Sequence, residues 1–218
     1  MTTTEHDPAK GREMIILCRS AKGGSGTTVT AGALGLLLAA RHRGGGYVVD
    51  LLGDLPAALG IAEPDGAAVA EVNSALRLLP RCMTPDATQT QWLSLATELQ
   101  SLRGPVVVDV GTLIPGKALL DAASASYLVT RPCYLALRRA THRIHQGEVG
   151  VDGCILVNEP GRALTRSDVA SVLQTPVCAD VPFETTISRA VDAGLLSHRV
   201  PRALDEALAG LIAEHTAK

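Results

Sequence analysis

The chain has 218 residues, of which 46% are hydrophobic and only 2% aromatic, so it suits one α/β domain whose core is built from Ala, Val, Leu and Ile. The formal net charge of −2 at pH 7 excludes an overall field that would attract DNA or an acidic membrane surface. The five cysteines form no C-x-x-C pair and no apolar run reaches about 18 residues, which predicts a cytoplasmic protein with reduced thiols and no transmembrane segment.

Residues 1–12 are polar and predict a disordered lead, after which one domain is expected over 13–216. Apolar runs then alternate with helical stretches, the pattern of a mostly parallel sheet with helices on both faces. The predicted strands are 13–18, 46–51, 105–110, 126–131, 153–158 and 176–181. The predicted helices are 27–41, 66–79, 89–102, 117–123, 134–146, 165–173, 185–196 and 201–215.

The segment between the first strand and the first helix, residues 18–28, reads CRSAKGGSGTT. Its glycines let successive backbone N–H groups face an anion, and the start of the helix adds its dipole. The lysine that usually ends such a loop is replaced by Thr27, whereas Lys22 precedes the glycines. We predict a phosphate-binding loop, with a ligand-free tight turn as the alternative; its members are Gly23, Gly24, Ser25, Gly26, Thr27 and Thr28.

A loop of the form Lys-Gly-Gly-x-Gly-x-Thr resembles the deviant Walker A motif of the ParA/MinD family of P-loop ATPases. Threonine in the second lysine position is similar to the CpaE/TadZ pilus-positioning members of that family. The resemblance implies a single P-loop NTPase domain that binds ATP and Mg²⁺ and forms a homodimer when ATP binds. It also implies that Lys22 reaches across the dimer to the phosphates of the partner.

Two of the predicted strands end in an aspartate, at the ligand-binding edge of an open α/β sheet. In the family the first of these strands ends Asp-x-Asp; Asp50 matches the first acid, and Leu52 stands where the second, which positions the attacking water, would be. Asp54 either replaces that acid or is a turn residue before Pro56. We therefore name Lys22 and Asp50 as the catalytic candidates.

The run Val106-Val107-Val108-Asp109 resembles a Walker B strand, whose aspartate holds Mg²⁺ through water. The alternative role for a strand-end aspartate is to cap a turn. Thr28 would bind the ion directly, because a hydroxyl at the start of the helix lies beside the phosphates. The predicted metal ligands are thus Thr28 and Asp109.

Two later segments are candidates for binding the base of the nucleotide. Asn158 ends its predicted strand and offers a donor and an acceptor on one amide; its alternative is a turn residue before Pro160. The pair Val181-Pro182 resembles the last motif of the family, a turn that passes near the base. Glu159 stands where the family usually has arginine.

A basic stretch surrounds the fifth predicted helix, with no acid between its first and last arginines; it contains Arg131, Arg138, Arg139 and Arg143. We interpret it as a solvated helix face or a protein contact, with weak non-specific DNA binding as the alternative. The predicted function is an ATP-binding, dimerising switch or scaffold with weak or lost hydrolysis that positions a pilus or secretion machine, a septum or a DNA partition complex. The alternatives are an active partition-type ATPase stimulated by a partner and an interaction module without nucleotide.

Overall fold

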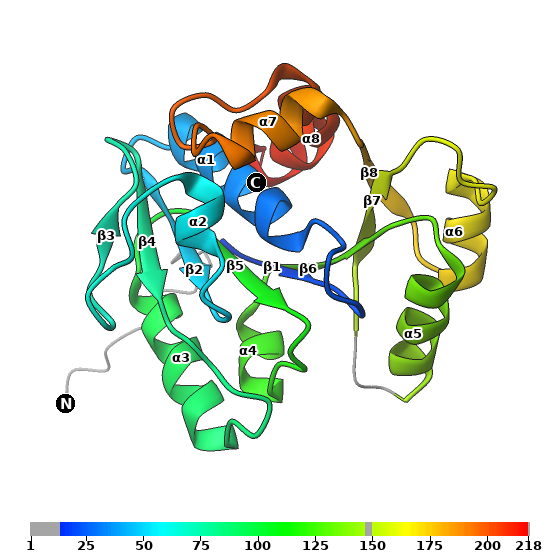
Figure 1. Cartoon of the computed structure of the whole chain (residues 1–218). Helices are drawn as coiled ribbons and strands as arrows, with labels where there is room; N and C mark the ends of the chain where they lie inside the picture. Colours follow the sequence, from blue (N-terminus) through cyan, green and yellow to red (C-terminus); the bar gives the residue numbers. More distant parts are fainter. Residues whose placement is uncertain (1–13, 147–149, 218) are drawn as a thin grey trace.

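The computed structural model describes residues 14–146 and 150–217, so the predicted N-terminal lead lies outside the described residues. The described strands join one eight-stranded sheet in the order β3-β4-β2-β5-β1-β6-β7-β8 (Figure 1). Every neighbouring pair is parallel except β3 and β4. The strands are β1 (Ile15–Arg19), β2 (Gly46–Asp50), β3 (Ala70–Glu71), β4 (Leu76–Pro80), β5 (Val106–Gly111), β6 (Ala125–Thr130), β7 (Gly153–Asn158) and β8 (Val177–Pro182).

Helices cover both faces of this sheet, as the sequence predicts. One face carries α1, α2, α7 and α8, and the other carries α3 and α4 beside the separate pair α5 and α6 (Figure 1). The fold is therefore the predicted mostly parallel α/β sandwich. The helices are α1 (Thr27–Arg41), α2 (Leu55–Leu59), α3 (Gln89–Ser101), α4 (Lys117–Ala122), α5 (Tyr134–His145), α6 (Arg166–Leu173), α7 (Thr185–Asp192) and α8 (Arg202–Thr216).

The two-residue period of the central strand β1 divides the core between the two faces. Ile16 and Cys18 face the α1 and α8 side, whereas Ile15 and Leu17 face α3 and α4. All four side chains are fully buried. A strand covered on both faces needs this continuous apolar run, because each side chain meets a helix layer whichever way it points.

The predicted helix over 66–79 is wrong, because this segment contains the hairpin of β3 and β4. The side chain of Asn73 accepts hydrogen bonds from the backbone N–H groups of Ala75 and Leu76, each at 2.9 Å, and closes the turn. Strand β4 then pairs in parallel with β2 and buries Leu76 and Leu78 in the sheet. An asparagine that bonds its own backbone favours a turn over a helix, and the sheet completes that preference.

The contact between α2 and α7 depends on the absence of a side chain at Gly60. This residue ends α2 with φ +72°, and an added Cβ would lie 2.0 Å from the carbonyl oxygen of Gly194. We expect Gly60→Ala to lower the free energy of unfolding by about 2–5 kcal/mol, since it combines a left-handed backbone with overpacking. Denaturant titration measures this change.

The matched control for Gly60 is Gly210, which lies within α8 and has no atom within 4 Å of its added Cβ. Gly210→Ala should stabilise the protein by about 0.5–1 kcal/mol, because alanine loses less backbone entropy in a helix. Equal effects of the two substitutions would contradict the importance of the α2–α7 contact.

Candidate functional site

The loop between β1 and α1 has the backbone of a phosphate cradle. Gly24 and Gly26 have φ of +74° and +90°, values that glycine adopts without strain. The Ser25 hydroxyl donates to the carbonyl of Lys22 at 2.7 Å, and the backbone N–H of Thr30 donates to Gly26 at 3.0 Å, which begins the helical ladder of α1. The loop is thus held in shape by its own bonds and opens into a helix N-terminus, a ready-made anion site.

Lys22 and Thr27 lie differently around this loop. Lys22 is half-buried, and its ammonium donates to the carbonyl of Gly23 at 3.2 Å, so it bends back onto its own loop. Thr27 is 6% exposed in the first turn of α1, and Thr28, at the next position, is half-buried. Within the described residues, Thr28 is the hydroxyl that interacts with Asp109 across the gap to β5.

Asp109 is fully buried near the end of β5, directly beside the cradle. Its Oδ1 accepts the backbone N–H of Gly111 at 3.0 Å, whereas its Oδ2 is buried without a hydrogen-bond partner among residues 14–146 and 150–217. The pKa of this carboxyl is raised to about 6, chiefly by burial and also by the nearby carboxylates of Asp50 and Asp54, while the hydrogen bonds from Thr28 and Gly111 act in the opposite direction. A buried anionic oxygen without a partner fits a cation, so Asp109 and Thr28 suit Mg²⁺.

The raised pKa makes Asp109 a cost to the fold in the nucleotide-free protein. Its pKa of about 6 exceeds the usual value of about 3.9 in an unfolded chain, so the folded state binds the proton more tightly. We therefore expect stability to fall as the pH rises from about 4 to about 6, by an amount on the order of 3 kcal/mol at pH 7. A cation bound beside Asp109 would remove this cost.

We expect Asp109→Asn to raise the free energy of unfolding of the nucleotide-free protein at pH 7 by about 1–3 kcal/mol and to flatten the dependence between pH 4 and 6. Asparagine keeps the shape and the bond to Gly111 but removes the charge. Urea titrations over this pH range measure the effect, with the exposed Asp65→Asn as control. A less stable Asp109→Asn at pH 7 would contradict the assigned burial cost.

Asp50 lies next to Asp109 in the sheet, where the two residues are paired in register. It is 1% exposed, and its carboxylate accepts three backbone N–H groups, from Leu52 at 3.1 Å and from Gly53 and Leu55 at 2.8 Å each. These bonds hold the loop that follows β2 in a fixed shape. The geometry gives Asp50 a positioning role, and a direct catalytic role stays a prediction.

The loop after β2 also contains Leu52, which stands where the resembling family has its second aspartate, and Asp54, the candidate to replace that aspartate. Leu52 is 40% exposed, and its Cδ1 lies 2.1 Å from where a Cβ on Gly111 would be, so its side chain covers the end of β5. Asp54 precedes α2 without capping it through its side chain, and its charge reaches Asp109. Asp54 is thus close enough to influence Asp109, the candidate metal ligand, whereas Leu52 places an apolar side chain over the end of β5.

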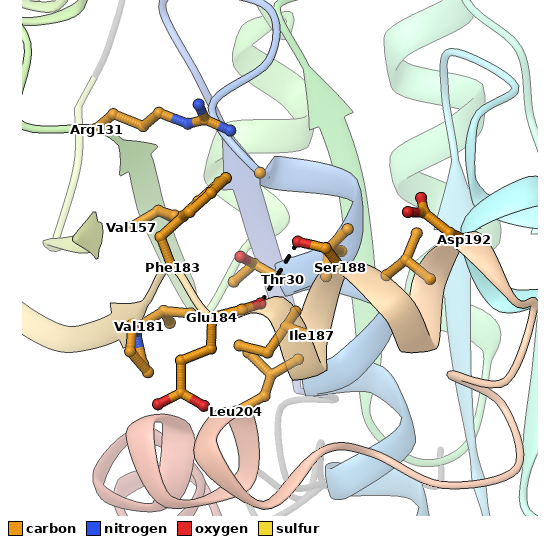
Figure 2. A pocket seen from close by; sticks show the side chains of 14 residues that line it. Thr30, Arg131, Val157, Val181, Phe183, Glu184, Ile187, Ser188, Asp192 and Leu204 are labelled. Carbon is orange, nitrogen blue, oxygen red and sulfur yellow. Dashed lines mark hydrogen bonds between the residues drawn. The ribbon is translucent and has the colours of Figure 1, made fainter. Parts of the chain in front are cut away.

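A cavity of about 290 Å³ opens beside Gly26, between α1, α7 and the end of β8 (Figure 2). Its walls are mostly apolar, and Arg131, Glu184 and Asp192 supply its charged groups (Figure 2). Pro182, predicted near the base, lines this cavity. The apolar wall contains Val29, Val157, Val181, Ile187, Val191 and Leu204.

Asn158 lies opposite Pro182 in the pairing of β7 with β8, so the structure brings the two base-site candidates together. Asn158 is exposed, and its backbone carbonyl accepts the N–H of Phe183 at 3.0 Å. It does not line the cavity. The two residues therefore form a rim at the carboxyl edge of the sheet, with Asn158 outside the cavity and Pro182 at its wall.

The arginines of the basic stretch lie in three different environments. The guanidinium of Arg131 lies 5.0 Å from the centre of the Phe183 ring at the cavity, with Glu159 at 4.0 Å (Figure 2). Arg143 points inward from α5, whereas Arg138 and Arg139 are exposed. The predicted basic helix face is therefore smaller than the sequence indicates, because only Arg138 and Arg139 of the four arginines belong to it.

Arg143 connects α5 to the phosphate loop, a contact that the sequence did not predict. Its Nη1 donates to the carbonyl of Thr112 at 3.0 Å and to that of Ser20 at 3.4 Å. Ser20 in turn donates its backbone N–H to Gly111 at 2.7 Å. One guanidinium thus joins the start of the loop and the segment after Asp109, and only the tertiary fold brings these residues together.

A glycine-bent loop between a strand and a helix, with a buried acid at the end of a neighbouring parallel strand, defines the class of α/β P-loop NTPase folds. Comparison with solved structures shows which proteins have a similar fold. A ParA family ATPase from Chlorobium tepidum superimposes with a TM-score of 0.73 at 17% identity, covering 92% of this chain and 98% of the other. No family model and no curated protein matches the sequence itself.

Other solved structures agree with this likeness. The septum site-determining protein MinD from Pyrococcus horikoshii, complexed with Mg-ADP, gives a TM-score of 0.71 at 17% identity, with 93% and 96% of the two chains covered. A plasmid partition protein from Borrelia burgdorferi bound to AMPPNP gives 0.69 at 14% identity, with 94% and 100% covered. The protein therefore has the fold of the ParA/MinD ATPases, which confirms the predicted resemblance; the finer likeness to CpaE/TadZ stays a prediction.

Within the part of the chain that the structure describes, no helix is both long enough and apolar enough to cross a membrane.

Proposed function

We propose that this protein is an ATP-binding switch or scaffold of the ParA/MinD type, which dimerises with nucleotide and positions or regulates a larger assembly. The observation that carries the proposal is the Oδ2 of Asp109, which is buried beside the cradle that Gly24 and Gly26 shape and has no hydrogen-bond partner among the described residues. An anionic oxygen kept in the core at a cost to stability calls for a cation, and a cradle of N–H groups calls for phosphate. Both requirements are met by a magnesium nucleotide.

The residues of the chain divide the task of binding as follows. The backbone of 23–28 holds the phosphates, Thr28 and Asp109 hold Mg²⁺, and the rim of Asn158 and Pro182 receives the base. When bound, the metal screens the phosphate charge and orients it. The cavity beside Gly26 suits a flat ring, because its walls are mostly apolar.

Apolar side chains at the carboxyl edge of the sheet support a nucleotide-dependent dimer. Leu52 follows β2 and is 40% exposed, and Ile114 follows β5 and is 47% exposed. Both flank the end of β5 where Asp109 lies. Large apolar side chains beside a polar site favour a surface that a second subunit covers.

The assembly that the protein serves is proposed at the level of its class. The solved relatives include a septum site-determining protein and a plasmid partition protein. The Thr27 variant of the loop favours a pilus-positioning member of the same group. We propose a protein partner from a pilus, secretion, septum or partition system, in a cytoplasmic setting.

Calorimetry with Mg-ATP tests the proposal. We expect ATP to bind better than ADP at high protein concentration, and Thr28→Ala to weaken magnesium-dependent binding by about tenfold or more, whereas Thr27→Ala changes it little. Thr27 is the matched control, because it is the same residue type one position earlier. Failure of ATP to bind at millimolar concentration contradicts the switch and favours an interaction module without nucleotide.

A further inference from the structure

Helices α5 and α6 lie on the sheet face opposite α7 and α8 (Figure 1). A groove of about 690 Å³ runs between them. Tyr134, Leu135 and Val172 lie at this groove and are 74%, 45% and 47% exposed. Below them, a separate cluster of buried side chains from the same helices packs on β6, β7 and β8. The exposed apolar groups are thus additional to the core that holds α5 and α6 in place.

The groove is lined by apolar and basic side chains. Arg138 and Arg139 line it and are exposed, and within residues 14–146 and 150–217 neither forms an ion pair. His142 and His145 also line it, and none of the lining residues that the structure describes carries a carboxylate. A surface of this kind complements a segment that carries both acidic and apolar side chains.

We infer that the α5–α6 groove binds an acidic amphipathic helix of a partner protein. Such a helix places its apolar residues, three or four positions apart, against Tyr134, Leu135 and Val172, and its carboxylates against the two free guanidinium groups. Arginine and tyrosine are the side chains that most often dominate the energy of such contacts. The inference rests on the proposed function only in that a positioning protein needs a partner.

Duplex DNA fits the same groove less well. Non-specific DNA binding gains its free energy from many neutralised phosphates, and two exposed arginines offer few. The remaining arginines of the stretch are committed elsewhere, Arg131 to Phe183 and Arg143 to backbone carbonyls. A phosphate backbone also leaves exposed leucine and valine side chains without an apolar partner.

Selection from a displayed library of random helical peptides, without nucleotide, tests the inference. The wild-type protein should select peptides rich in Asp and Glu with apolar residues at helical spacing. The double variant Arg138→Glu/Arg139→Glu should lose this acidic bias and weaken binding of a selected peptide by about tenfold or more. Tyr134→Ala should weaken the same peptide without changing the charge preference.

Arg202→Glu on α8 is the matched control, since it reverses an exposed charge on the opposite face and should leave peptide binding unchanged. Thermal unfolding confirms that each variant stays folded. A library without acidic bias, or equal binding by the double variant, overturns the inference. Loss of duplex DNA binding in the double variant, with no peptide selected, assigns the groove to nucleic acid instead. Failure here leaves ATP binding by calorimetry unaffected, so the two proposals are tested separately.

Discussion

Lys22→Ala is expected to abolish ATP-driven dimer formation while leaving the monomer folded. Lys22 precedes the cradle, and its ammonium donates to Gly23 within its own loop, so it is badly placed to grip a terminal phosphate bound in the same chain. An ammonium from the opposite subunit would neutralise phosphate charge at a face that also buries Leu52 and Ile114. Desolvated charge pairs of this kind contribute strongly to association.

Light scattering with and without Mg-ATP measures the effect. The mass of the wild-type protein should rise from monomer towards dimer with ATP, and the mass of Lys22→Ala should not change. Lys117→Ala is the control, because this exposed lysine on α4 pairs only with Asp121 on its own helix within the described part of the chain. A wild-type mass that ignores ATP, or a variant that still dimerises, contradicts a lysine acting in trans.

Linkage adds an independent check on the same idea. If the nucleotides lie within the dimer contact, the affinity for ATP and the affinity for the second subunit depend on each other. The apparent affinity of the wild type for ATP must then rise with protein concentration. That of Lys22→Ala should stay constant over the same range.

The strand–loop–helix conformation of the predicted phosphate loop was predictable because it is a local property. Gly24 and Gly26 have the positive φ angles that such a loop needs, and no distant residue is required to explain their type. The central strands were predictable for a related reason, since β1 and β5 are covered on both faces and therefore read as near-continuous apolar runs. The fold class follows from these two patterns.

The segment 66–79 shows where local patterns mislead. Its alanines and apolar residues fit a helical period, yet Asn73 closes a turn and β4 pairs with β2 in the sheet. A short apolar run such as 76–79 satisfies a helix and a strand equally well until its neighbour is known. Residues 76–80 form a strand because they pair with β2 in the sheet.

The candidate site residues could be chosen by type and position, whereas their energetics could not be predicted from the sequence. Asp109 was a candidate metal ligand from its place at a strand end, but its raised pKa and unpartnered oxygen follow from burial that only the packed helices create. The division of the arginines has the same origin: Arg131 reaches Phe183 from another strand, and Arg143 reaches Thr112. Contacts such as these join segments far apart in the sequence, so the local spacing of residues does not predict them.

ATP hydrolysis by the protein alone is expected to be very slow or undetectable. Phosphoryl transfer needs an oriented water and positive charge beside the transferred group. Leu52 stands where the resembling family has its water-positioning acid, and Thr27 stands where a second lysine would be. Loss of one such group typically lowers the rate by about 10²–10³-fold, so two losses together leave little turnover.

The double substitution Leu52→Asp with Thr27→Lys should give measurable turnover, about 10²-fold or more above that of the wild type. Leu52 lies over the end of β5, so an acid there would lie near Asp109 and the predicted phosphate site. Phosphate release under single-turnover conditions measures the rate, and Leu52→Asn with Thr27→Gln is the control of similar size without charge. Rapid hydrolysis by the unaided wild type would contradict the prediction and assign the water-orienting role to Asp54, whose charge already reaches Asp109 from the same loop.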